Sequence, residues 1–462
     1  MIKQIRITTI LWLALAATFP SFAQQQQTHT LGSLWPLVKA NYPGISARTA
    51  AIDAAQLNEQ AVKSNMLPQV SAQVQHTYGT YKGNAGAFFP QPGFFNVSGA
   101  TNPSARSIAT AANSFGSAMV EWELFSFGKL RKESQAAGAL LRKTVSEKEA
   151  YLLHLKKTLA ERYITLLYND AKLNWTAKNA ARLDSIRNLT AGLSAAGLRP
   201  AADSLLASSS YVQAMGERDK WDGLKNASVI HLVELYGTDL IDYTASARRF
   251  SNPVASQVNG ESVLTPSHPL LDALDRQSGY HQLSGEAQKR SALPSLRLLG
   301  GYAYRGTGIG PEGMVSGAWK DGFSNSTSNV LAGIGIVWNI TDLHTSRLTG
   351  EKLFKEAERT KLLHAQYKQA MQADLSASQA KIVQQYEQLQ KTRLAVRQSQ
   401  DAYNMYVARY KSGLIALTEL LQIRTLLEQA ENAHIGASRD YWMLLAYKAE
   451  LTADFDFLFN NL

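Results

Sequence analysis

The distribution of proline constrains the fold of this 462-residue chain more than any other feature of its sequence. Proline is absent between Pro103 and Pro200 and again after Pro311. Because proline disrupts the interior of a helix, these two segments permit very long helices. Both are rich in Ala, Leu, Lys, Gln, Glu and Arg, which favour helix. The sequence therefore predicts long helices over residues 129–196 and 345–412.

An apolar or aromatic residue recurs every seven positions in both segments. The recurring residues are Leu152, Leu159, Leu166, Leu173 and Ala180 in the first, and Leu375, Ile382, Leu389, Val396, Tyr403 and Tyr410 in the second. A seven-residue period is typical of a coiled-coil seam. At 1.5 Å per residue each helix would be about 100 Å long, which is far longer than an ordinary globular helix.

Each long helix is predicted to end at a turn that contains glycine. The first turn is Gly197-Leu198-Arg199-Pro200, where glycine stops one helix and proline begins the next. The second turn is Gly413-Leu414-Ile415. We expect shorter helices to return from these turns over about residues 201–236 and 415–453.

The two halves of the chain resemble each other. A shift of 226 residues superimposes Leu67-Pro68 on Leu293-Pro294. After the following loop, a shift of 216 residues superimposes Trp122 on Trp338 and Gly197-Leu198 on Gly413-Leu414. The two heptad series coincide at this second shift. The sequence therefore predicts an internal duplication.

Two segments of alternating apolar and polar residues precede each long helix. Val70, Ala72 and Val74 alternate with polar residues in the first repeat, and the clearest pattern covers residues 330–340 in the second. Strands of about ten residues with one apolar face suit an outer membrane, although hairpins of a soluble β-sandwich would show the same alternation. Aromatic girdles at the membrane surfaces would then be formed by Tyr78, Tyr302 and Tyr304 near one end and by Trp122 and Trp338 near the other.

Four strands cannot close on themselves in lipid. A barrel needs about eight strands, and unpaired strand edges are not tolerated in a bilayer. Membrane-spanning strands would therefore have to be shared between copies of the chain. Two copies would supply eight strands and three would supply twelve, and the strand count alone leaves this choice open.

The first 23 residues have the features of a cleaved signal peptide. Lys3 and Arg6 precede a short apolar run, and the small residues Ser21 and Ala23 flank its end. We therefore expect export across the inner membrane. No later stretch is apolar enough for a transmembrane helix, so a membrane span would have to consist of strands.

Composition argues against several classes of function. The absence of cysteine excludes disulfides, thiolate metal sites and thiol nucleophiles. The histidines have no metal-binding spacing, and no serine lies in a nucleophile elbow. The net charge is +10, but Lys and Arg are scattered among Glu and Asp instead of being clustered. This distribution is typical of solvated helix faces and not of a nucleic-acid-binding surface. We therefore predict no enzymatic activity, no cofactor, no metal site and no nucleic-acid partner.

The order of these elements and several short motifs resemble the TolC-like outer-membrane efflux family. The motifs are Asn41-Tyr42-Pro43 with Leu67-Pro68, His268-Pro269 with Leu293-Pro294, the segment 122–128 that begins Trp122-Glu123-Leu124, and the segment Tyr410-Lys411-Ser412-Gly413-Leu414 that continues to Leu421. The resemblance implies a homotrimer in which a long coiled-coil α-helical barrel continues a small membrane β-barrel, with four strands per protomer. It also implies a bacterial outer-membrane channel, mostly in the periplasm, that contacts outer-membrane lipid and serves an inner-membrane transporter through a periplasmic adaptor protein.

On this basis the chain divides into consecutive segments. These are a signal peptide (1–23), N-terminal helices (24–67), strands and an external loop (68–127), a helical hairpin (128–236), an equatorial linker (237–266), a second-repeat helix (267–293), strands and a loop (294–343), a second hairpin (344–453) and a tail (454–462).

The resemblance also implies roles for residues at the two turns. The tips at Gly197, Leu198, Gly413 and Leu414 would close the pore and dock the adaptor. Under threefold symmetry, Asp203 and Glu419 would each form a ring of carboxylates that attracts cations. Either residue is equally explained as an ordinary acid in the first turn of a helix.

The chain departs from the family at the position that usually carries a basic latch residue. Ile415 occupies that position, and Arg199 at the matching place in the first repeat is a candidate substitute. Tyr410 matches a latch tyrosine but also continues the heptad, so packing explains it as well. The second acidic position of the family is Gln422. We therefore predict a constriction that involves Asp203, Glu419, Arg199 and Tyr410 but is weaker or differently built. The alternative function is a soluble periplasmic coiled-coil scaffold or adaptor.

Overall fold

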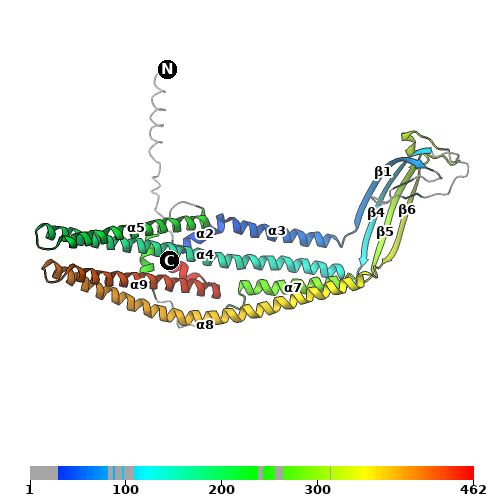
Figure 1. Cartoon of the computed structure of the whole chain (residues 1–462). Coiled ribbons are helices and arrows are strands. Elements are labelled where there is room, and N and C mark those ends of the chain that lie inside the picture. The colour runs from blue at the N-terminus through cyan, green and yellow to red at the C-terminus, as the bar shows by residue number, and fades with distance from the viewer. Residues whose placement is uncertain are drawn as a thin grey trace, which may run out of the picture. The chain divides into compact units, whose positions relative to one another are not determined.

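The computed structural model describes residues 30–81, 87–88, 96–97, 109–237, 243–254, 264–312 and 314–462 (Figure 1). The predicted signal peptide, and parts of the first external loop and of the equatorial linker, lie outside these residues. The described chain is mostly helical and contains a four-stranded antiparallel sheet, which confirms the predicted combination of long helices and four strands.

The main elements occur twice in the same order. In the first half they are α2 (Leu31–Asn41), α3 (Pro43–Ser64), β1 (Gln69–Tyr81), β4 (Ala109–Phe125), α4 (Lys129–Ala195) and α5 (Ala201–Tyr236). In the second half they are α7 (Pro269–Arg290), β5 (Ser295–Thr307), β6 (Thr327–Val337), α8 (Asp342–Lys411) and α9 (Leu417–Thr452). Shorter elements are β2 (Ala87–Phe88), β3 (Asn96–Val97), α6 (Thr244–Ser251), the 3-10 helix η1 (Trp319–Phe323) and α10 (Asp456–Asn461).

The chain forms two compact units. Of the described residues, the first unit contains those within 30–46, 150–268 and 369–462, and the second contains those within 47–149 and 269–368. In the first unit, α5 returns along α4 and α9 returns along α8 (Figure 1).

The core of the first unit contains the predicted coiled-coil positions. Leu159 and Leu166 on α4 and Ile382 on α8 are each at most 1% exposed. They belong to a cluster that also contains Tyr163 and Trp442. The Trp442 indole N–H donates to the carbonyl of Phe250 at 3.2 Å, so α9 is also fixed to α6. Burial of the seven-residue stripe explains why these helices are stable at such length.

The second unit contains the sheet, with strand order β1-β4-β5-β6. All three pairings are antiparallel. Tyr78 of β1 lies opposite Ala112 of β4, Ala118 of β4 lies opposite Tyr302 of β5, and Tyr302 lies opposite Val330 of β6. Directly opposed residues lie on the same side of a sheet, so the register assigns every strand residue to one of two faces.

One face of the sheet is apolar, and we call it the apolar face. It carries Val70, Val74, Val120, Leu298, Val330, Ile334 and Ile336. Val74 is 88% exposed and Val330 is 82% exposed, so the side chains on this face are not packed in a protein core. The opposite face carries Gln73, Glu121 and Arg297, and the last two form an ion pair.

The alternation of the two faces along β4 is interrupted near its end. A β-bulge shifts the register between Glu123 and Phe125, so that Phe125, rather than Leu124, lies opposite Leu296. One extra residue in a strand moves every later side chain to the other face. The predicted pattern over 330–340 is also too long, because β6 ends at Val337.

Candidate functional site

The two predicted turns between long and returning helices have the same backbone conformation. Gly197 and Gly413 adopt left-handed φ angles of 71° and 77°. In the first turn Leu198 N–H donates to Leu193 and Gly197 N–H donates to Ser194, and in the second Leu414 donates to Arg409 and Gly413 to Tyr410. These are Schellman motifs, in which glycine accepts the left-handed conformation without the steric cost of a Cβ atom.

The leucine after each glycine is exposed. Leu198 is 69% exposed and Leu414 is 70% exposed. In a Schellman motif the residue at this position usually packs back on its own helix. Each turn instead presents a large apolar side chain to its surroundings.

Behind the turns lies an apolar cluster to which both hairpins contribute, and we call it the tip cluster. It consists of Ile186, Ala207, Tyr403, Tyr410, Ile415, Leu417, Leu420 and Leu427. Ile415, which stands at the position predicted for a latch residue, is only 6% exposed and is therefore part of the core.

Arg199 joins the first turn to the second hairpin. Its Nη2 donates to the carbonyl oxygen of Ile415 at 2.8 Å, and its guanidinium lies 5.2 Å from the centroid of the Tyr410 ring. Arg199 therefore combines a charge-assisted hydrogen bond with a cation–π contact. The structure brings together Arg199, Tyr410 and Ile415.

Tyr410 is fully buried in the tip cluster. Its hydroxyl lies beside the Thr190 side chain but makes no hydrogen bond of ordinary geometry within the described part of the chain. Burial raises the pKa of Tyr410, and the carboxylate of Asp203 raises it further. Arg199 and Thr190 oppose this shift. Tyr410 is therefore a neutral packing residue at neutral pH, and its ring is also the surface on which Arg199 rests.

The two predicted acidic residues differ in their surroundings. Asp203 is half-buried in the first turn of α5 and close enough to Tyr410 to affect its titration. Glu419 is exposed in the first turn of α9, where its Oε1 accepts a hydrogen bond from the N–H of Ala416 at 3.3 Å. Within one protomer, Glu419 therefore caps the start of α9.

A second group of contacts between α4 and α9 was not predicted from the sequence, and we call it the polar seam. Its members are Lys172, Asn179, Arg182, Arg424, Glu428, Glu431 and Asn432. Both guanidinium nitrogens of Arg182 bond to the Glu431 carboxylate, and this hydrogen bond raises the pKa of Arg182. The sequence did contain one sign of the polar seam, because Arg424, Glu428, Glu431 and Asn432 are spaced three or four residues apart and therefore share one face of a helix.

The predicted girdle tryptophans make equivalent contacts in the two repeats. The indole N–H of Trp122 donates to the carbonyl of Met66 at 2.9 Å, and that of Trp338 donates to Ala292 at 3.0 Å. Both acceptors follow the last turn of a helix, α3 and α7, whose terminal carbonyls lack helical partners. Of the predicted girdle tyrosines, Tyr78 lies near the loop end of its strand and Tyr302 lies near the middle of β5.

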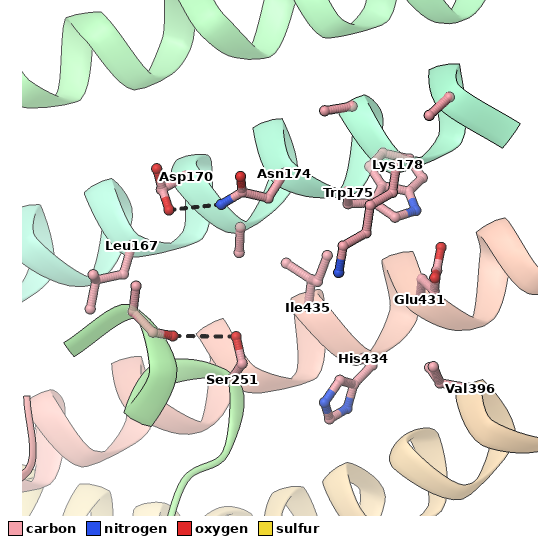
Figure 2. Close-up of a pocket in the computed structure, with 14 residues that line it drawn as sticks. Leu167, Asp170, Asn174, Trp175, Lys178, Ser251, Val396, Glu431, His434 and Ile435 are labelled. Atoms are coloured by element: carbon pink, nitrogen blue, oxygen red, sulfur yellow. Dashed lines mark hydrogen bonds between the residues drawn. The ribbon is translucent and has the colours of Figure 1, made fainter. Parts of the chain in front are cut away.

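A cleft of about 650 Å³ lies between α4, α6, α8 and α9 (Figure 2). Its charged groups are largely paired, since Asp170 accepts from Asn174 and Glu431 accepts from Arg182. His434 bonds to Thr392, and burial lowers its pKa, so it is neutral at neutral pH. The Ser251 hydroxyl donates to the carbonyl of Ala247, and the polar side chains of the cleft mainly connect the helices.

Within the ranges that the structure describes, no three His, Asp or Glu side chains are grouped closely enough to hold a metal ion. In the same ranges, no helix is both long and apolar enough to span a bilayer.

The model of a protein family described as "Outer membrane efflux protein" matches residues 34–238 and 284–442. The chain belongs to this family. An outer membrane efflux protein of this kind is a component of a tripartite system, located in the bacterial outer membrane with its long helices in the periplasm, as the sequence predicted. The family consists of transport conduits, which does not support the alternative of a soluble scaffold.

Solved structures agree with this assignment at the level of the fold. The efflux protein is similar to the CmeC outer membrane channel of Campylobacter jejuni, with 12% identity, a TM-score of 0.71, and coverage of 94% of this chain and 90% of CmeC. For VceC of Vibrio cholerae the identity is 15%, the TM-score 0.70 and the coverage 94% and 98%. For the open state of the MtrE channel of Neisseria gonorrhoeae, the identity is 16% and the TM-score is 0.63, with coverage of 92% of this chain and 89% of MtrE. No curated protein sequence matches the chain.

Proposed function

We propose that three copies of this efflux protein form one continuous passive channel from the periplasm to the exterior. The sheet carries this proposal, because β1 and β6 each have one partner in the described sheet and the apolar face is exposed. Lipid does not tolerate unpaired strand edges. Pairing β6 of one copy with β1 of the next satisfies both edges, and three copies supply the twelve strands that the TolC-like resemblance implies.

In this assembly the segments 68–127 and 294–343 form the membrane β-barrel. The apolar face contacts lipid, and the face with Gln73, Glu121 and Arg297 lines the lumen. The hairpins 128–236 and 344–453 form the periplasmic α-helical barrel, with the linker 237–266 at its equator. A polar lumen surrounded by an apolar outer surface suits a water-filled conduit.

The constriction of this channel lies at the two turns. Arg199 takes the place of the missing basic latch residue, because it bonds to the backbone of Ile415 and covers Tyr410. Around a threefold axis Asp203 and Glu419 form carboxylate rings that favour cations. Lumen-facing acids on three copies repel one another, so these rings also bias the width of the opening.

The exposed leucines Leu198 and Leu414 are the docking points for a periplasmic adaptor protein. The adaptor in turn connects the channel to an inner-membrane transporter, for efflux or for type I secretion. The pump then determines which substrates enter the channel.

Cross-linking tests the shared barrel. The chain has no cysteine, so pairs with one cysteine on β1 and one on β6 can be scanned without background. We expect disulfides between copies to produce a covalent trimer in the outer membrane, and native mass spectrometry in detergent to give the same stoichiometry. A covalent dimer at saturation, or a monomer by mass, contradicts the proposal.

Planar-bilayer recordings test the constriction. We expect Glu419→Ala and Asp203→Asn to reduce cation selectivity, because each removes three charges from one level of the pore. Asp222→Asn on the same helix as Asp203 is the matched control, since Asp222 is an exposed acid farther from the turn. Unchanged selectivity in both variants would remove these residues from the constriction.

A further inference from the structure

A short segment between β5 and β6 lies against the apolar face of the sheet. It runs from residue 308 to residue 326 and contains η1. We call the ends of the strands that are joined by loops, rather than by helices, the loop ends. The pairs His76–Ser114 and Tyr78–Ala112 of β1 and β4 mark this region of the apolar face.

Direct packing holds η1 on this face. The ring centroid of His76 lies 4.0 Å from that of Trp319 and 5.0 Å from that of Phe323. His76 is itself fixed by a 2.8 Å hydrogen bond between Nδ1 and the Ser114 hydroxyl. A Cβ atom at Gly322 would lie 2.6 Å from His76 Cε1, so only glycine permits this close approach.

Two tyrosines of the strands bond to the segment. The Tyr78 hydroxyl donates to the carbonyl of Gly317 at 2.9 Å, and the Tyr304 hydroxyl donates to that of Phe323 at 3.1 Å. Within the segment, the Asp321 carboxylate accepts a hydrogen bond from Ser316. The segment is therefore attached to β1 and β5, and Asp321, one of its two acidic residues, has a partner within it.

The outer surface of η1 is aromatic and cationic. Trp319 is 61% exposed and Phe323 is 53% exposed, although both rings contact His76. Lys320 is exposed between them and forms no ion pair within the described part of the chain. Exposed Trp and Phe beside an unpaired Lys are the combination that favours the interface between acyl chains and phosphate groups.

We propose that η1 anchors the channel to the outer leaflet by binding phosphate-bearing lipid. This inference rests on the proposed function, in which the apolar face contacts acyl chains and the loop ends point away from the periplasm. Trp319 and Phe323 insert at the top of the acyl chains, and the Lys320 ammonium extends to the lipid phosphates. The occupant is lipid because η1 continues the same face that Val74 and Val330 present to the bilayer.

Single-cysteine labelling tests the position of η1. The Trp319→Cys variant is labelled with an environment-sensitive fluorophore and reconstituted into vesicles of phosphatidylethanolamine and lipopolysaccharide. Nitroxide-labelled lipid quenches a label that lies in the membrane, and iodide quenches a label that lies in water. Ile334→Cys reports on the middle of the apolar face, and Gln73→Cys on the opposite face. We expect nitroxide lipid to quench the labels at 319 and 334 several-fold more than the label at 73.

The outcomes separate this inference from the proposed function. If nitroxide lipid quenches the label at 334 while only iodide quenches the label at 319, the inference is overturned and the membrane barrel stands. A label at 319 that neither quencher reaches is covered by protein, which also overturns it. A label at 334 that lipid does not quench contradicts the proposed function itself.

Lys320→Glu tests the phosphate contact. In vesicles of a phosphate-free galactolipid we expect added lipopolysaccharide to raise the thermal midpoint of the parent protein, and this shift to fall by at least half in Lys320→Glu. Lys352→Glu is the matched control, because Lys352 is exposed on α8 and should leave the shift unchanged. An equal shift in Lys320→Glu and the parent would overturn the role of Lys320.

Discussion

The α8–α9 pair and the α4–α9 pair both contribute buried apolar side chains to shared clusters, but the α4–α9 pair adds a second kind of contact. Along α8, Leu375, Ile382 and Leu389 are all buried at seven-residue intervals. Between α4 and α9, the polar seam is made of ion pairs and amide hydrogen bonds such as Arg182–Glu431 and Asn179–Glu428. Apolar burial is strong and independent of direction, whereas polar contacts can be exchanged for water or for other partners.

This difference indicates which parts of the protein are built to stay together. A hairpin with an apolar seam unfolds when the seam is opened, because apolar surface becomes wet. The contacts of the polar seam can open at lower cost than the apolar clusters beside them, since water replaces the lost hydrogen bonds. We therefore expect changes in the apolar seam to affect stability, and changes in the polar seam to affect conductance.

The largest effect should come from Leu389→Ala. Leu389 is 0% exposed, and truncation leaves a cavity that costs about 2–5 kcal/mol of unfolding free energy. Chemical denaturation followed by circular dichroism measures this loss. Leu394→Ala on the same helix is the matched control, because Leu394 is 53% exposed, and a similar loss there would show that the apolar seam has no special role.

Glu431→Gln should have a smaller effect on stability and a larger one on conductance. The Arg182–Glu431 pair is about 15% exposed on each side, and removing the charge weakens it by about 1–3 kcal/mol. We expect the mean single-channel conductance to rise in planar bilayers, because α9 is held less firmly to α4. Glu387→Gln, at an exposed acid of α8, is the control. A stability loss as large as that of Leu389→Ala, with unchanged conductance, would contradict the comparison.

Arg199→Ala tests the contact between the two turns. It removes the bond to Ile415 and the cation–π contact with Tyr410, together worth about 1–2 kcal/mol, and should raise open probability modestly. Tyr410→Phe is the control, because it keeps the ring that Arg199 covers and removes a hydroxyl that lies beside Thr190 and takes no part in the Arg199–Ile415 bond. Equal effects of the two variants would argue that packing alone holds the tip.

The smallest effect concerns alkaline pH. Burial, followed by the hydrogen bond to Asp374, raises the pKa of Tyr447 to about 12 from its usual 10.0. Between these pH values the unfolded state loses the proton while the folded state keeps it, so stability falls as pH rises through this window. Tyr447→Phe should reduce that slope in pH-dependent denaturation. An unchanged slope would show that Tyr447 titrates normally.

Local sequence patterns predicted much of the fold. The heptads at Leu159 and Ile382 are sufficient to indicate long helices because a helix repeats its surface every few residues, and neighbours in the sequence are neighbours on the helix face. Gly197 and Gly413 predicted the turns for an equally local reason, namely the left-handed conformation that each adopts. The duplication reinforced both inferences.

The sequence failed where a contact depends on the relative alignment of distant segments. Arg182 and Glu431 are 249 residues apart, and neither residue alone indicates a partner. The bulge at Glu123 changed which side chains share a face, which alternation cannot predict. Arg199 was a candidate latch residue from its position, but its acceptor, the backbone of Ile415, emerged only from the packing of the two turns.

By itself, the sequence determined the elements of this protein: two pairs of long and returning helices, four strands with one apolar side, and the glycines at which the helices turn. These follow from periodicity and backbone preference, which act over a few residues. The tertiary structure alone decided the polar seam, the site of Arg199 and the position of η1 on the apolar face. Such contacts depend on the register between segments far apart in the chain, and register is set only when the side chains of all of them pack together.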